Sequence, residues 1–284
     1  MIIKNNLTRL IFVAFLFPCN YLLGQDNEVI DHAKYQFTYL LTYQMDSTDA
    51  DNIKSEEMML TVGEKTSKFQ SMNGYLRDSI VNDVKKMNIP TMEKIGMLGD
   101  LPKSNFKEII FKDYANNSIV YREEVLRDYF EYKEKLHIFN WVIEEERQTI
   151  NGYDCQKATT KYAGRAYEAW YTQEIPISDG PYKFNGLPGL IIRIYDTKHH
   201  YLYDLIEVKK TADQKITSSK EKHIVTTPKG LSKVKRESFE NVFSKLEQGG
   251  VSITFNDPSQ KGEMRKIAKE KAAKKNNPIE LTYE

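Results

Sequence analysis

The sequence has few cysteines, no long apolar run beyond its first residues, and no excess of charge of either sign. Its two cysteines are Cys19 and Cys155. Once a leader containing Cys19 is removed, no intramolecular disulfide can form, so stability has to come from a hydrophobic core. That leader also carries Lys4 and Arg9, which leaves 39 basic and 40 acidic residues and a net charge of −1. A nearly neutral chain gives no reason to expect nucleic acid as a partner.

Sequential catalytic and ligand-binding motifs are also missing. The chain has no Gly-x-Ser-x-Gly, no His-Glu-x-x-His, no phosphate-cradling glycine loop and no dinucleotide fingerprint, which disfavours the enzyme classes that carry them. Only His199 and His200 are adjacent histidines, and in a strand they would point to opposite faces. We therefore predict no metal and no cofactor. A hydrolase with a dispersed pair of carboxylates stays open, because such pairs are set by spatial distance.

The N-terminus has the layout of a secretory signal. Lys4 and Arg9 precede an apolar run from Leu10 to Phe17, and Gly24 precedes a polar segment. We expect cleavage near Gly24, which makes residues 1–24 a signal peptide and the mature chain periplasmic or secreted. An uncleaved anchor is disfavoured because the run is too short to span a bilayer, and no later segment approaches the length needed. Lipidation at Cys19 is disfavoured because Phe17 and Pro18 precede it instead of small residues.

Most of the first two thirds of the chain reads as short strands. In the segment 34–43, aromatic or aliphatic residues alternate with polar ones, which is typical of a half-buried strand. Similar runs follow at Glu57–Val62, Thr66–Met72, Lys107–Tyr114, Ser118–Glu123, Asp128–Lys133 and Phe139–Glu144. Their regular spacing predicts an antiparallel meander.

Two hairpins are expected after this meander. The first joins 154–162 to 166–172 through Ala163-Gly164-Arg165, and the second joins 191–195 to 201–208. Cys155 lies on the first of these strands and is expected to behave as a small buried hydrophobe more than as a nucleophile.

Helices are expected at three places. Leu76, Ile80 and Val84 are four residues apart, which predicts a helix between 74 and 87 inserted in the sheet. An apolar stripe predicts a core-facing helix at about 230–248, and Asp257-Pro258 opens a Lys-rich, largely solvated helix at about 258–275. The predicted fold class is therefore α+β. We expect one domain over residues 25–284, with a large curved, mainly antiparallel sheet and C-terminal helices.

The segment from Trp170 to Ile194 is rich in Gly and Pro turn signals. It contains Gly180-Pro181-Tyr182-Lys183-Phe184 and the hexapeptide Gly186-Leu187-Pro188-Gly189-Leu190-Ile191. With Gly152-Tyr153-Asp154-Cys155 and the tail Asn276-Asn277-Pro278-Ile279-Glu280-Leu281, this resembles the GLPGLI family of secreted Bacteroidetes proteins. The resemblance implies an exported protein and brings no catalytic residues. By a weaker analogy of architecture, the meander is similar to the open half-barrel of lipoprotein carriers.

Backbone geometry explains the glycines and prolines of this segment, since proline fixes φ and glycine adopts conformations closed to other residues. A functional interpretation makes the loop a recognition surface, with Tyr182, Phe184, Asn185 and Leu187 as the contact residues. We expect an exported, non-enzymatic binding or accessory protein whose partner is an envelope or outer-membrane protein, or a lipid or peptide ligand. The alternatives are a hydrolase with a dispersed site and a structural subunit of an outer-membrane assembly, for which an exposed apolar patch would be the sign.

Overall fold

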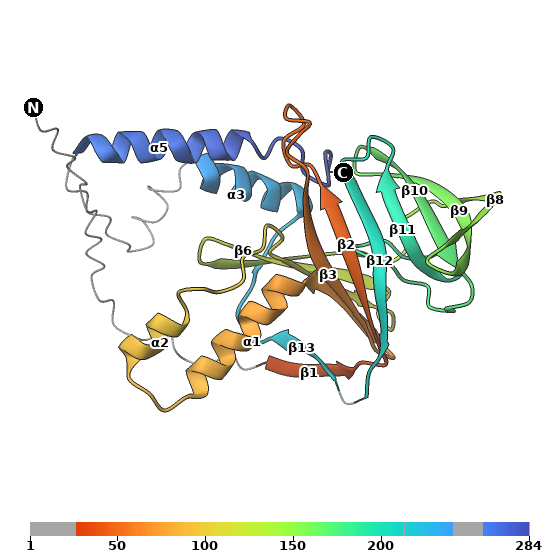
Figure 1. Cartoon of the computed structure of the whole chain (residues 1–284), viewed down its shortest axis with the longest axis horizontal. Helices are drawn as coiled ribbons and strands as arrows, with labels where there is room; N and C mark the ends of the chain where they lie inside the picture. Colours follow the sequence, from red (N-terminus) through yellow and green to blue (C-terminus); the bar gives the residue numbers. More distant parts are fainter. Residues whose placement is uncertain (1–26, 213, 241–257, 284) are drawn as a thin grey trace, which may run out of the picture.

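One large, curved sheet dominates the computed structural model, which describes residues 27–212, 214–240 and 258–283 (Figure 1). In the described part of the chain this sheet has 12 strands in the order β14-β7-β6-β5-β4-β3-β2-β12-β11-β10-β9-β8. All neighbours are antiparallel except β14 and β7. The first half contains β2 (Tyr35–Tyr43), β3 (Lys54–Val62), β4 (Thr66–Ser71), β5 (Glu108–Asp113), β6 (Ser118–Val125), β7 (Asp128–Lys135) and the short β14 (Ile224–Val225). The second half contains β8 (Val142–Ile150), β9 (Tyr153–Tyr162), β10 (Arg165–Thr172), β11 (Leu190–Asp196) and β12 (Tyr201–Lys210).

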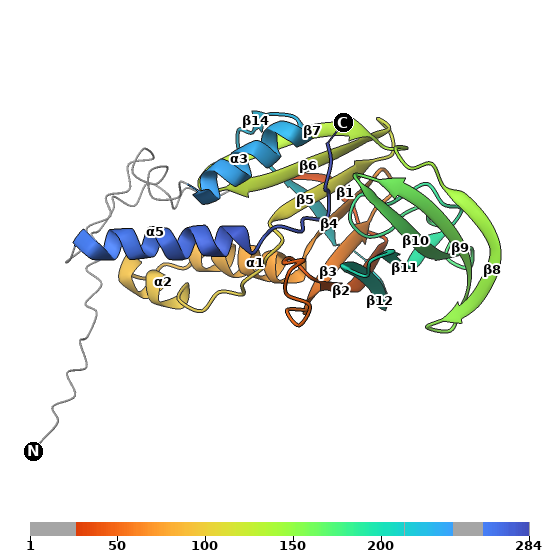
Figure 2. The same cartoon turned by 90° about the horizontal axis from the view of Figure 1, so that it is seen from above.

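The two halves are consecutive meanders joined by one long-range pairing. β2 pairs with β3 on one side and with β12 on the other, from Tyr43 opposite Tyr201 to Tyr35 opposite Lys210. The sheet remains open, with β14 and β8 at its edges. Figure 2 shows it curling into a half-barrel whose two halves face each other across a concave interior.

Alternation along the strands decides which side chains fill that interior. On β2 the residues Phe37, Tyr39, Leu41 and Tyr43 all lie in the main hydrophobic cluster, because residues two apart share one face of a strand. On the opposite face of β5, Phe111 packs with residues of a separate two-stranded sheet. This sheet pairs β1 (Asn27–His32) with β13 (Lys215–Ser219). It covers part of the convex side.

Two short helices form an insertion between β4 and β5. They are α1 (Met72–Lys86) and α2 (Thr91–Met97). The Ser71 hydroxyl caps α1 by accepting a hydrogen bond from the backbone N–H of Gly74 at 3.1 Å. α1 buries only Val84, and α2 buries no residue. The pair projects from the sheet, at the lower left of Figure 1.

The C-terminal helices lie beside the other end of the half-barrel. α3 (Pro228–Glu240) buries Leu231 and partly buries Val234, as its predicted core-facing stripe requires. α5 (Pro258–Ala273) runs beside α3 and ends at the C-terminal tail (Figure 2).

The structure confirms the predicted fold class, the inserted helix and both hairpins. The strand predicted at 139–144 is wrong in its first part, since β8 begins at Val142 and Phe139 instead packs on Trp141 and Phe184. α2, β1, β13 and β14 were not predicted. The expected helix at 230–248 is confirmed up to residue 240, and its remainder and the signal peptide at 1–24 lie outside the described residues. The division into one domain stays a prediction.

Candidate functional site

The turn-rich segment 173–189 buries residues 179–185 in the interior of the half-barrel, while its first part, 173–178, is exposed or half-buried. Its anchor is Lys112 of β5, which is fully buried. The Lys112 ammonium forms a salt bridge with Asp179 and donates hydrogen bonds to the backbone oxygens of Gly180 at 2.6 Å and Phe184 at 3.0 Å. The Tyr114 hydroxyl donates to the other Asp179 oxygen at 2.5 Å. Desolvation lowers the pKa of Lys112, while Asp179 opposes that shift.

A second buried cation, Lys183, lies further along the same segment. Its ammonium is 2.6 Å from a carboxylate oxygen of Glu134 on β7 and 2.6 Å from one of Glu280 in the C-terminal tail. Rings of four tyrosines lie 5.0 to 5.7 Å from it, namely Tyr121, Tyr132, Tyr162 and Tyr182. The negative ring faces and the two carboxylates compensate for the loss of hydration of this charge.

The four side chains expected to contact a partner are all interior. Tyr182, Phe184, Asn185 and Leu187 expose 2%, 0%, 2% and 1% of their surface. Phe184 packs against Tyr167 and Phe139, and the Asn185 amide donates to the backbone oxygen of Leu136 at 2.8 Å. A partner cannot reach these side chains in the described conformation. The four residues of the predicted partner-binding loop therefore lie in the core, and their role in partner binding stays a prediction. The sequence did not show this burial because turn signals ordinarily mark surface loops.

The glycines of the hexapeptide have structural reasons. Gly186 has φ +94°, a conformation that favours glycine. A Cβ on Gly189 would lie 2.0 Å from the backbone oxygen of Thr172, so only glycine allows the segment to pass this strand end. Gly180, Pro181, Leu190 and Ile191 are buried, whereas Pro188 is exposed. The Tyr39 hydroxyl donates to the backbone oxygen of Ile191 at 2.7 Å, which ties the hexapeptide to β2.

Buried carboxylates gather near α3. Burial, together with the charge of Glu123, raises the pKa of Glu108 to about 7. Glu123 is compensated by Lys235 of α3, whose ammonium is 2.8 Å away, and by the Tyr121 hydroxyl at 2.8 Å. Glu56 accepts hydrogen bonds from the Ser71 and Ser104 hydroxyls, both at 2.5 Å. Glu108 and Glu123 are buried, and neither of them lines the cavity beside Asp31 or the cavity beside Arg147.

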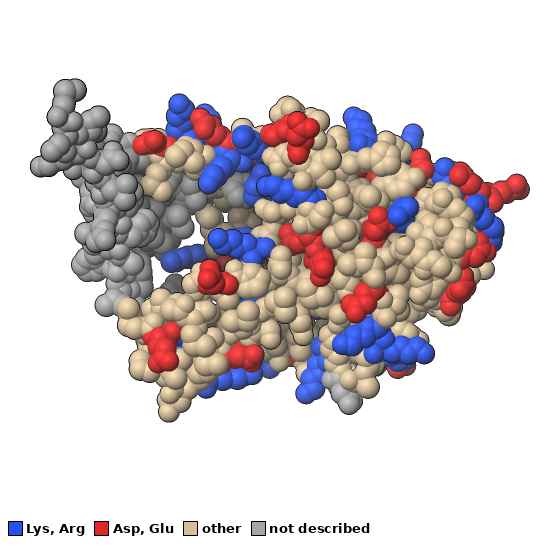
Figure 3. All heavy atoms as spheres, in the orientation of Figure 1, with Lys and Arg blue, Asp and Glu red and all other residues tan. Residues whose placement is uncertain are grey.

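Several exposed apolar side chains lie on the α1–α2 insertion. We define the hairpin face as Tyr75, Leu76, Ile80, Met87, Met92, Ile95 and Met97. These side chains expose between 38% and 68% of their surface. Figure 3 shows the insertion at lower left as largely uncharged, with a few acidic and basic side chains. Periodicity in α1 was visible in the sequence, but the absence of a partner for its outer face was not.

A family model described as "Protein of unknown function (Porph_ging)" matches residues 161–193. The match runs from the end of β9 through β10 and the buried segment into β11, which is the part that carries the GLPGLI hexapeptide. This match supports the resemblance to the GLPGLI family. No curated protein sequence matches it.

Two solved structures resemble this chain distantly. They are described as "Structure of PNGF-II in P21 space group" and "Structure of PNGF-II in C2 space group". Sequence identity is 13% and 14%, the TM-score is 0.49 for both, and each covers 72% of this chain. The chain spans about a third of the length of these solved chains, 34% and 33%.

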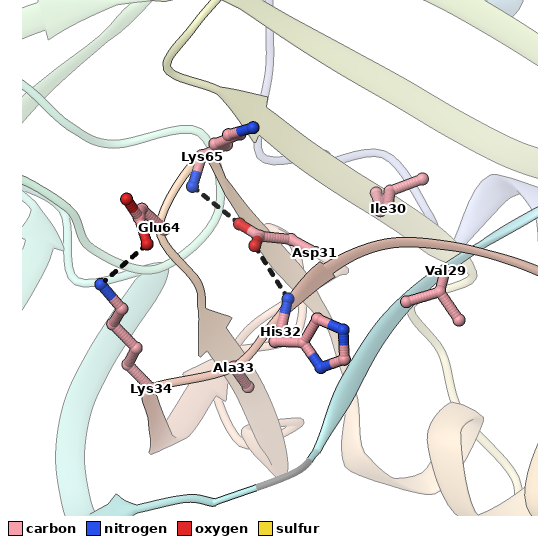
Figure 4. Close-up of a pocket in the computed structure, with 8 residues that line it drawn as sticks. All are labelled: Val29, Ile30, Asp31, His32, Ala33, Lys34, Glu64 and Lys65. Carbon is pink, nitrogen blue, oxygen red and sulfur yellow. Dashed lines mark hydrogen bonds and ion pairs between the residues drawn. The ribbon is translucent and has the colours of Figure 1, made fainter.

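Two surface cavities lie among residues that local hydrogen bonds and ion pairs hold in place. The larger, about 540 Å³, lies at the end of β1 (Figure 4). Its Asp31 carboxylate accepts backbone hydrogen bonds from His32 at 2.8 Å and Lys65 at 2.7 Å. Partial burial opposes ionisation of Asp31, but these N–H donors hold its pKa below the ordinary value. The smaller, about 180 Å³, lies beside the Arg147–Asp154 ion pair.

The other residues considered from the sequence take structural roles. Cys155 is buried, and desolvation raises the pKa of its thiol to about 11, which disfavours a thiolate nucleophile. His199 stacks on Tyr195 in the turn after β11, while His200 lies 3.3 Å from the Arg165 guanidinium. Among the described residues, no group of three or more potential ligands could hold a metal ion. Within the same ranges, no helix is long and apolar enough to cross a membrane.

Proposed function

We propose that this chain is an exported, non-enzymatic accessory protein that docks an envelope protein through the hairpin face. The observation that carries the proposal is the exposure of seven apolar side chains on α1 and α2, which no other element of the described residues buries. Contiguous apolar surface of this kind on a folded chain marks an interaction site more often than a neutral feature. The signal-like residues at 1–24 support export.

The composition of the insertion suits an adaptable protein contact. Of the nine methionines in the chain, four lie between 72 and 97, and methionine side chains adjust readily to the shape of a partner. The insertion carries charges of both signs, with four basic residues, Arg77, Lys85, Lys86 and Lys94, and three acidic ones, Asp78, Asp83 and Glu93. A mixed rim fits a protein better than an anionic lipid surface, which selects clusters of basic residues.

The filled interior also supports an external docking site. The concave face, where a lipoprotein carrier would hold cargo, is occupied by the segment 173–189 through Lys112 and Lys183. An amphipathic ligand would have to displace this segment, which would leave the Lys112 ammonium buried without Asp179 and separate Lys183 from Glu134 and Glu280. The cost of that displacement favours a partner bound outside the half-barrel.

Replacing four residues of the hairpin face by serine tests the proposal. The variant is Leu76→Ser, Ile80→Ser, Met92→Ser and Ile95→Ser, and the matched control is Val142→Ser with Ile143→Ser, which are equally exposed on the edge strand β8. We expect both variants to keep the free energy of unfolding within about 1 kcal/mol, because exposed positions contribute little to stability. Only the hairpin variant should lose chemical crosslinks to a specific envelope protein in intact cells.

Liposome flotation separates a protein partner from a lipid surface. Full-length mature chain is mixed with vesicles of neutral lipid and with vesicles that contain about one third anionic lipid. The proposal predicts that the chain stays with the soluble fraction in both cases. Flotation that the serine variant abolishes would contradict a protein partner and assign the hairpin face to the membrane.

A further inference from the structure

The C-terminal tail crosses one end of the half-barrel as an extended segment (Figure 2). Asn277 is held there by four hydrogen bonds to the body of the protein. Its backbone N–H donates to Met45 O at 3.0 Å, and its side-chain amide donates to Gln44 O at 2.6 Å. Its side-chain oxygen accepts from Arg165 and its backbone oxygen from the Tyr201 hydroxyl, both at 2.6 Å. Because the Asn277 side chain both donates and accepts a hydrogen bond here, these contacts favour asparagine at this position.

Arg165 binds the backbone oxygens of the next two residues of the tail. Its guanidinium donates to the Pro278 oxygen at 2.6 Å and to the Ile279 oxygen at 2.9 Å. Asp196 of β11 holds the same guanidinium at 3.0 Å. Since this ion pair lies wholly within the sheet, Arg165 keeps a partner and its orientation whether or not the tail is present.

Glu280 is bound by a second polar group three residues later. Its carboxylate lies 2.6 Å from the Lys183 ammonium and accepts hydrogen bonds from the Tyr162 and Tyr182 hydroxyls, both at 2.8 Å. Lys183 also keeps a carboxylate partner in the body, Glu134. Lys183, the cation that binds Glu280, therefore keeps a carboxylate partner even without the tail.

The attachment of the tail is confined to this short segment. None of the side chains described for α5, residues 262–273, is buried, so the helix before the tail contributes little to its retention. The tail is held by hydrogen bonds and ion pairs, and Ile279 is its only apolar residue packed on the core. Removing it would expose polar groups that water can satisfy, which distinguishes a bound peptide from a strand of the core.

We propose that this end of the half-barrel is a peptide-binding site, selective for an extended Asn-Pro-x-Glu segment, and that residues 276–281 are its resident ligand. The site lies apart from the hairpin face and does not depend on the function proposed for it. Proline in the second position fixes one backbone angle, which lowers the entropy lost when the segment binds.

A cleavable tail tests the site in the full chain. A specific protease site is inserted after Lys271 in the exposed part of α5, the chain is cut, and the cut protein is mixed with an excess of fluorescent peptide of the sequence 272–284. We expect the labelled peptide to replace the resident segment under native conditions, as measured by fluorescence anisotropy, while circular dichroism of the sheet stays unchanged.

Competition with unlabelled peptides measures selectivity. Asn277→Ala and Glu280→Gln peptides should each compete about tenfold more weakly or worse, because each loses charge-assisted hydrogen bonds. A Lys274→Ala peptide, changed at an exposed residue, should compete like the natural sequence. Absence of exchange, loss of the fold when the cut segment is diluted away, or equal competition by the Asn277→Ala peptide would each overturn the proposal.

Discussion

At the scale of residues, the chain places charged groups in an aromatic interior and compensates each one locally. Lys112 and Lys183 are both fully buried, yet each has a carboxylate within salt-bridge distance. The two sites differ from surface ion pairs because solvent cannot replace a lost partner. We therefore expect a large loss of free energy of unfolding when one partner of either ion pair is removed.

Asp179→Asn should leave the Lys112 ammonium buried without a compensating charge. We expect the free energy of unfolding to fall by about 3–5 kcal/mol, the range for breaking a buried ion pair from one side. The matched control is Asp154→Asn, which breaks the exposed pair with Arg147 and should cost no more than about 1 kcal/mol. Urea unfolding measures both, and equal losses would contradict the anchoring role of Lys112.

Glu108 should make stability depend on pH. Its pKa in the folded protein is raised to about 7, so between its ordinary pKa and about 7 the folded state holds a proton that the unfolded state has released. Stability therefore decreases as pH rises through this window. Glu108→Gln removes that loss, and the variant should gain on the order of 1–3 kcal/mol over the natural protein above pH 7.

The difference between the two proteins should shrink as pH falls to 4.5 and below, where Glu108 becomes protonated in the unfolded state as well. Thermal unfolding over pH 4 to 8 checks this, with Glu93→Gln on the exposed helix α2 as the control. A variant that is less stable than the natural protein at every pH would show that ionised Glu108 is needed for folding.

At the scale of elements, the sequence predicted the turns and strands that depend on residues close together in the chain. The Ala163-Gly164 turn was expected, and both residues have positive φ, 47° and 82°, as a two-residue hairpin turn requires. The Asn151-Gly152 turn before β9, with φ of 51° and 85°, carries the same signal and was overlooked. β1 and β13 could not be found, because they pair with each other across most of the chain and neither has a clear alternating pattern.

Gly189→Ala tests why the hexapeptide has its final glycine. The new Cβ would lie 2.0 Å from the backbone oxygen of Thr172, so the segment 173–189 must shift from the interior. We expect a loss of roughly 3 kcal/mol or more, the scale of overpacking in a core. Gly262→Ala is the control, since nothing lies within 4 Å of its Cβ, and in a helix it should stabilise by up to about 1 kcal/mol. Guanidinium unfolding gives both values, and a neutral Gly189→Ala would refute the contact.

At the scale of the whole molecule, the open curved sheet followed from the sequence, but the use of its interior did not. The meander was predictable because its strands are neighbours in the chain, whereas the β2–β12 pairing that joins its halves is a long-range contact. Tyr182 and Phe184 were assigned to the surface because the turns around them are rich in Gly and Pro. Only the three-dimensional positions of Lys112 and Lys183 show that these turns return the segment into the concave face.

The sequence also did not predict that the hairpin face is exposed. Periodicity shows that α1 has an apolar side, but not whether another element covers it. In the described structure α1 buries Val84, while Leu76 and Ile80 stay exposed. The molecule therefore turns its aromatic residues inward and leaves its methionine-rich insertion outside, which is the arrangement expected of a scaffold that presents a docking element.

Site-specific photocrosslinking in intact cells tests this central claim most directly. A photoreactive amino acid is placed at Ile80 or at Met92 on the hairpin face, and at Val142 on β8 as the control position. We predict that both hairpin positions form a crosslink to the same envelope protein and that the Val142 position does not. Crosslinks of equal yield and pattern from all three positions, or none from the hairpin positions, would contradict the assignment of α1 and α2 as the docking element.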